Sequence, residues 1–100
     1  MSTEVLRSED MTAEYRALVV QLMESQAYRE LAAAQMFGYG LQFVPSLKWL
    51  KFMTWHIREE MEHYEDVVKM YQELTGESVE PIVHGRLKDC LLYTSPSPRD

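Results

Sequence analysis

The chain has 100 residues, of which 46% are hydrophobic and 26% charged, with four Gly and four Pro. This length allows at most one domain, and the composition is typical of a compact helical chain. The formal net charge is −6 and the basic residues form no cluster, which argues against nucleic acid as a partner. There is no apolar run of about 18 residues, so no membrane span is predicted, and the start lacks the basic region of a secretory signal. We therefore expect a cytoplasmic protein.

The last eleven residues, 90–100, differ in character from the rest of the chain. They read CLLYTSPSPRD, which resembles the translation of a transposase adapter used to build sequencing libraries. We therefore expect residues 1–89 to be the N-terminal half of a larger domain and residues 90–100 to be a tail that is not native to it. Without this tail the chain has no cysteine, so carboxylates and histidines are the available metal ligands, and such donors suit iron or manganese.

Hydrophobic periodicity predicts a first helix over residues 12–37. Asp10 or Thr12 is its expected N-cap, and the stretch from Gly38 to Gly40 is its expected end. The main apolar stripe of this helix includes one carboxylate and consists of Tyr15, Leu18, Val19, Leu22, Gln26, Glu30, Ala33 and Phe37. A second, weaker stripe consists of Val20, Glu24, Ala27 and Leu31. Glu30 is thus the first candidate metal ligand on this helix, and Glu24 is the alternative.

A second helix is predicted over residues 46–74, because Pro45 favours a helix start and Gly76 a helix end. Its stripe consists of Leu50, Met53, Ile57, Glu60, His63, Tyr64, Val67, Tyr71 and Leu74. Two long helices joined by a short loop form an antiparallel hairpin, so the predicted fold is all-α. Residues 77–89 are expected to be a connecting segment, since Pro81 bars a continuous helix.

The second stripe contains the pair Glu60-x-x-His63. Residues three apart share one face of a helix, so this carboxylate and this imidazole can hold one metal ion. Because both lie within an apolar stripe, we expect both to point into the core. A buried carboxylate needs a proton, a charged partner or a metal. The alternative is that both groups lie at a wetter edge without a function, since a Glu-x-x-His pair arises readily by chance in a Glu-rich chain.

With Glu30 on one helix and Glu60-x-x-His63 on the next, the chain resembles the first half of a ferritin-like di-iron carboxylate protein. That four-helix bundle takes one Glu from each of two helices and one Glu-x-x-His from each of the other two. More narrowly, residues 11–63 resemble the catalytic subunit of the ring 1,2-phenylacetyl-CoA epoxidase family, the multicomponent phenylacetate oxygenase. The features that carry this resemblance are Tyr15-Arg16, Glu30, Pro45 and Glu60-x-x-His63 at intervals of fifteen residues, followed by the segment from His84 to Lys88.

The resemblance implies an oxidoreductase in which two iron ions activate O₂ to epoxidise the ring of an aryl-CoA thioester such as phenylacetyl-CoA. It implies two protein partners, a ferritin-like structural subunit and an NAD(P)H-dependent reductase. By position, Glu30 would be a terminal ligand of one iron, Glu60 a bridging carboxylate and His63 an imidazole ligand. The remaining ligands would come from third and fourth helices, so we expect the chain by itself to be inactive.

Two other readings of the same residues stay open. One is a ferritin-like hairpin that binds or oxidises iron and completes its site by dimerising. The other is a metal-free structural subunit of an oxygenase complex, although the presence of all three ligands weighs against it. His56, one turn before Glu60, and Gln26, one turn before Glu30, are candidates for supporting the ligands or lining a substrate pocket. A histidine beside a tryptophan is, however, more often a simply packed residue.

Overall fold

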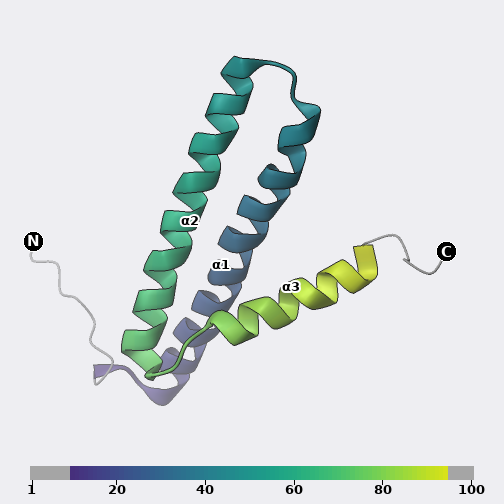
Figure 1. Cartoon of the computed structure of the whole chain (residues 1–100). Coiled ribbons are helices and arrows are strands. Elements are labelled where there is room, and N and C mark those ends of the chain that lie inside the picture. Colours follow the sequence, from purple (N-terminus) through teal and green to yellow (C-terminus); the bar gives the residue numbers. More distant parts are fainter. Residues whose placement is uncertain (1–9, 95–100) are drawn as a thin grey trace, which may run out of the picture.

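The computed structural model describes residues 10–94, with side chains described for residues 10–89. Over this part the chain is all-helical and contains no strand. Its elements in chain order are the long helix α1 (Ala13–Gly40), the short 3-10 helix η2 (Leu41–Phe43), the long helix α2 (Leu47–Thr75) and the helix α3 (Glu80–Thr94). Helices α1 and α2 lie side by side in opposite directions, and α3 leaves the end of α2 at an angle to them (Figure 1). The predicted helical hairpin is therefore present.

Helix α1 begins where the sequence predicts but ends later. Thr12 is the N-cap, because its hydroxyl accepts a hydrogen bond of 3.1 Å from the backbone N–H of Tyr15. The helix ends at Gly40, within the predicted stretch from Gly38 to Gly40 but three residues after the predicted boundary at 37, and it leads directly into η2. Neither glycine adopts a positive φ. Glycine costs a helix about 1 kcal/mol relative to alanine, a penalty that the packing of a long hairpin outweighs.

Helix α2 has the predicted ends. The Ser46 hydroxyl accepts a hydrogen bond from the Trp49 N–H at 3.5 Å, which makes Ser46 the N-cap. Gly76 ends the helix in the left-handed conformation, with φ of 78°, and its N–H donates to the Gln72 carbonyl.

The connecting segment predicted over residues 77–89 is wrong, because α3 already begins at Glu80. Pro81 is its second residue, and in the first turn a proline forfeits only an N–H that has no partner within the helix. Proline thus marks the start of α3 rather than preventing it. The helix passes position 89 without a break and ends at Thr94, whereas residues 95–100 of the predicted tail lie outside the described part of the chain.

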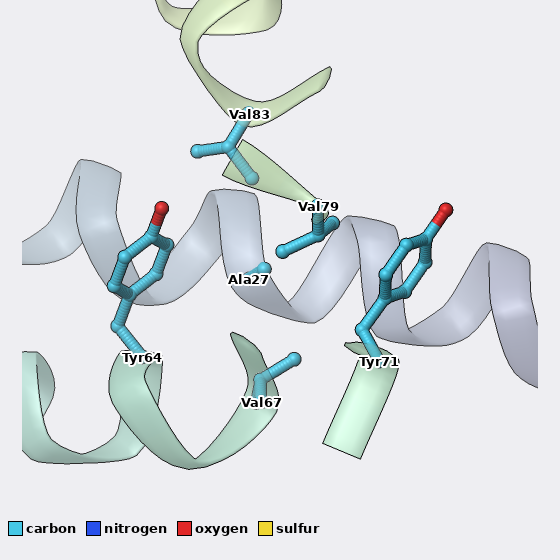
Figure 2. Packing of buried hydrophobic residues seen from close by; sticks show 6 residues of the cluster. All are labelled: Ala27, Tyr64, Val67, Tyr71, Val79 and Val83. Carbon is cyan, nitrogen blue, oxygen red and sulfur yellow. The ribbon is translucent and has the colours of Figure 1, made fainter. Parts of the chain in front are cut away.

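A small core joins the three long elements (Figure 2). It consists of Ala27 from α1, Tyr64, Val67 and Tyr71 from α2, Val79 from the residue before α3, and Val83 from the first turn of α3. On α2 these residues belong to the predicted stripe. On α1 the main predicted stripe does not face the core, because Leu18 and Leu22 are more than half exposed. The weaker stripe, with Val20, Ala27 and Leu31, packs there instead. The reason is size, since the small Ala27 lets two other helices approach α1 closely.

Candidate metal centre

Three potential metal ligands meet between α1 and α2 at the middle of the hairpin. Glu30 projects from α1, and Glu60 and His63 project from neighbouring turns of α2. One ligand atom from each lies within 4.8 Å of the others. Within this group, His63 Nδ1 lies 3.5 Å from Glu30 Oε2. The hairpin therefore places side by side the three residues that the sequence singles out.

The three side chains differ in exposure. Those of Glu30 and Glu60 are each 17% exposed, whereas that of His63 is 55% exposed. The expectation that Glu60 and His63 both point into the core is therefore wrong for His63, whereas Glu60 is largely covered without belonging to the core. Tyr64, Val67 and Tyr71 define the side of α2 that is buried, and His63 lies at the edge of that side, where no described element covers it.

The carboxyl groups of Glu30 and Glu60 interact with each other and with two histidines. The pKa of the Glu60 carboxyl is raised, first by hydrogen bonding with Glu30, then by burial and by the negative charge of Glu30, with His56 and His63 acting in the opposite direction. The Oε2 atom of Glu30 is buried and accepts no hydrogen bond. This oxygen faces His63 Nδ1 at 3.5 Å without a hydrogen bond, so a bound cation would recover part of the free energy that its burial costs. Two carboxylates and an imidazole form a donor set that fits iron, manganese or zinc.

An open pocket of about 370 Å³ adjoins the ligands on the same side of the hairpin. Its lining residues are Gln26, Glu30, His63, Asp66, Val67 and Met70. Gln26 thus lines a pocket beside the ligands, as the sequence suggested. Asp66 was not predicted, because it lies outside the apolar stripe of α2. Its position three residues after His63 is the signal that indicates its place next to the site.

His56 contacts the group through Glu60. Its Nε2 lies 3.4 Å from Glu60 Oε1, one helical turn further along α2. On its other side the ring of Phe37 packs edge-on, with the ring centroids 4.6 Å apart. His56 is half-buried. His56 is thus packed against an aromatic ring and also faces the carboxylate of a candidate ligand.

Glu24, the alternative ligand, has a different partner. The Tyr71 hydroxyl donates a hydrogen bond of 2.9 Å to Glu24 Oε2. Burial and this hydrogen bond raise the pKa of Tyr71 to about 12. Near the same end of the hairpin, the Arg16 guanidinium donates to the backbone carbonyl of Leu74 at 2.9 Å. Glu24 is outside the group of three ligands and ties α1 to α2 instead.

Comparison with known proteins adds no name to this arrangement. No family model, curated protein or solved structure gives a significant match to the chain. Within the described residues, none of the helices is both long and apolar enough to cross a lipid bilayer.

Proposed function

We propose that the chain binds iron through Glu30, Glu60 and His63 and forms half of a ferritin-like di-iron site that activates O₂. The observation that carries this proposal is the convergence of one Glu from α1 with a Glu-x-x-His pair from α2 within 4.8 Å. Each half of a ferritin-like bundle contributes this combination of ligands. The buried Glu30 Oε2 accepts no hydrogen bond and faces His63 Nδ1 at 3.5 Å, which supports a cation bound between these residues.

Each residue has a definite part in this proposal. Glu30 and Glu60 supply negative charge that balances the cation, and Glu60 gives up any proton it holds when the cation binds. His63 donates from a neutral imidazole nitrogen, and His56 fixes the orientation of the Glu60 carboxylate from one turn away. Bound iron would supply the one-electron chemistry that O₂ reduction requires. Gln26 and Asp66 line the pocket together with Glu30 and His63, so a small molecule in this pocket would reach the ligands.

In its finer form, the proposal is that of an oxygenase catalytic subunit. The substrate would be an aryl-CoA thioester, the protein partners a ferritin-like structural subunit and an NAD(P)H-dependent reductase, and the location the cytoplasm. This form rests on the resemblance of residues 11–63 to the phenylacetyl-CoA epoxidase family. The positions of Glu30, Glu60 and His63 in one group are what that resemblance requires of the ligands.

The proposal is tested by counting bound iron and by thermal unfolding with and without ferrous iron under anaerobic conditions. A metal that binds only the folded state raises its stability by mass action. We expect Glu30→Ala, Glu60→Ala and His63→Ala each to lower the iron content and to abolish the iron-dependent rise in Tm. Glu62→Ala is the matched control, because its carboxylate is exposed and pairs only with Arg58, at 3.4 Å.

The two outcomes are distinct. A loss of bound iron in the three variants, but not in Glu62→Ala, would support a specific site formed by Glu30, Glu60 and His63. Equal iron content and an equal rise in Tm for the unmodified chain and His63→Ala would refute the metal site. The metal-free structural subunit would then be the better description of the chain.

A further inference from the structure

A second pocket lies between α2 and the start of α3, apart from the candidate metal ligands. Its volume of about 340 Å³ falls within the range of small-molecule sites. We call it the α3 pocket; it is lined by Met61, Tyr64, Glu65, Val68 and Lys69 from α2 and by Glu80, the first residue of α3. The five α2 residues are spaced so that they share one side of the helix. The α3 pocket and the pocket beside the metal ligands have no lining residue in common.

The Tyr64 hydroxyl has no partner within the described part of the chain. Tyr64 is only 7% exposed, and its hydroxyl oxygen is buried without a hydrogen bond. Tyr71, seven residues later on the same helix, directs its hydroxyl away from α2 in the same way, but donates it to Glu24 at 2.9 Å (Figure 2). Buried hydroxyl groups are as a rule hydrogen-bonded. Tyr64 therefore presents an unused polar atom beside the α3 pocket.

Glu80 brings negative charge to this hydroxyl. Burial raises the pKa of Tyr64, and the charge of Glu80 raises it further. The phenol therefore stays neutral and can accept as well as donate a hydrogen bond.

The charges of the lining do not balance. Lys69 follows Glu65 by four residues on α2, a spacing at which opposite charges attract each other. Glu80 is exposed and forms no ion pair with any residue that the structure describes. Two carboxylates against one ammonium leave the α3 pocket with a net negative charge. The rest of its lining is apolar, because Met61 and Val68 contribute only a thioether and methyl groups.

From these observations we propose that the α3 pocket binds a small primary amine that carries an apolar group. An ammonium group has three N–H donors, so it can donate to the Glu80 carboxylate and to the Tyr64 oxygen together. The apolar group lies against Met61 and Val68. A carboxylate or phosphate in the same place would be repelled by Glu80. The site involves none of the candidate metal ligands, so this inference does not rest on the proposed function.

The test titrates the metal-free, isotope-labelled 100-residue chain with benzylamine and follows the backbone amide signals by NMR. We expect shifts that saturate and are centred on residues 61–69 and 80. Benzyl alcohol has the same ring without the charge, and benzyltrimethylammonium has the charge without an N–H donor. Each should bind roughly tenfold more weakly than benzylamine, because each lacks the charge-assisted hydrogen bonds.

Three variants test the two polar residues. Glu80→Gln should weaken benzylamine binding roughly tenfold, and Tyr64→Phe should weaken it roughly fivefold. Glu73→Gln is the matched control, because it removes the same charge from an exposed position of α2 outside the pocket. Without amine, Tyr64→Phe should not lower Tm, since the hydroxyl it removes has no partner. Circular dichroism checks the helix content of all three variants.

Three results would overturn the inference. Equal affinity for benzylamine and benzyl alcohol would identify an unspecific apolar surface. An equal loss of affinity in Glu80→Gln and Glu73→Gln would show that only the overall charge of the chain attracts the amine. A lower Tm of Tyr64→Phe together with an unchanged affinity would show that water is the partner of the hydroxyl.

Discussion

The imidazole of His56 is held between an aromatic ring and a ligand carboxylate. Its Nε2 lies 3.4 Å from Glu60 Oε1, and Phe37 packs edge-on against it from α1. Glu60 is therefore oriented from within its own helix, whereas Glu30 approaches from the other helix. A residue that orients a ligand affects the strength of metal binding more than the number of ions bound.

His56→Phe tests this relationship. The substitution keeps a ring against Phe37 and removes the nitrogen that faces Glu60. We expect the iron affinity to fall by roughly 10- to 100-fold, with the number of ions bound at saturation unchanged. Competition with a chromophoric chelator under anaerobic conditions measures the affinity. His84→Phe, at an exposed position on α3, is the control. An unchanged affinity in His56→Phe would show that Glu60 needs no support.

The pair of carboxyl groups predicts how the metal-free chain responds to pH. The pKa of Glu60 is raised above its ordinary value of 4.5, first by hydrogen bonding with Glu30. The folded state therefore holds this proton more tightly than the unfolded state does. Its contribution to stability is complete below pH 4.5 and is lost as the pH rises through the folded-state pKa.

Glu60→Gln removes this titration. We expect the variant without metal to lose less stability than the unmodified chain as the pH rises above 4.5, because Gln stays neutral. Urea unfolding over a series of pH values measures the free energy of unfolding. Glu62→Gln, whose carboxylate is exposed beside Arg58, should keep the pH dependence of the unmodified chain. Parallel profiles for all three proteins would contradict the prediction.

The sequence predicted α2 better than α1, and the reason is physical. On α2 one strong apolar stripe coincides with the buried side, and Ser46 and Gly76 mark its ends. On α1 two stripes compete, and the stripe with the larger apolar residues lies away from the core, where Leu18 and Leu22 are more than half exposed. Ala27 lies in the core instead, because the close approach of three elements favours a small side chain at this position. Hydrophobic periodicity shows which residues are apolar but takes no account of the size of their side chains.

The candidate site was predictable to the extent that its ligands obey helical spacing. Glu60 and His63 are three residues apart on one helix, and the hairpin then determines which residue of α1 faces them. The exposure of His63 was not predictable, because His63 lies at the edge of the buried side of α2 and periodicity does not locate that edge. The hydrogen bond from Tyr71 to Glu24 joins residues 47 positions apart, and no local pattern indicates it.

The role of Ala27 predicts an effect of size at one position. This residue is fully buried, whereas Ala17 on the same helix is exposed. We expect Ala27→Leu to destabilise the chain by about 1–3 kcal/mol, because the added atoms have no space between the helices. Ala17→Leu should change the stability by less than about 0.5 kcal/mol. Urea unfolding of both variants measures the difference. Similar stabilities would show that the three elements do not pack closely at Ala27.

Two glycines, Gly76 at the end of α2 and Gly85 inside α3, should respond in opposite ways to replacement by alanine. Gly76 has φ of 78°, and a Cβ there would meet no atom within 4 Å, so only its backbone conformation opposes a side chain. Gly76→Ala should destabilise the chain by about 1 kcal/mol. Gly85 lies inside α3, where a Cβ also meets nothing within 4 Å. Gly85→Ala should stabilise the chain by about 0.5–1 kcal/mol, because alanine favours helix. Thermal unfolding should show Tm shifts of opposite sign, and shifts of the same sign would contradict the assigned ends of the helices.

The bond between Tyr71 and Glu24 predicts a loss of stability in alkali. Tyr71 is 4% exposed, and burial, followed by its hydrogen bond to Glu24, raises its pKa to about 12.

The folded state thus holds the phenolic proton more tightly than the unfolded state does, so this contribution to stability is complete below about pH 10 and is lost as the pH rises towards 12. Tyr71→Phe keeps the ring and removes the hydroxyl. At neutral pH it should cost about 0.5–1.5 kcal/mol for the lost hydrogen bond, and the decline in stability between pH 10 and 12 should become shallower. Tyr39→Phe, at an exposed position, should change neither the stability nor its slope with pH. Urea unfolding across this pH range gives both quantities, and a slope as steep in Tyr71→Phe as in the unmodified chain would show that another group releases the proton.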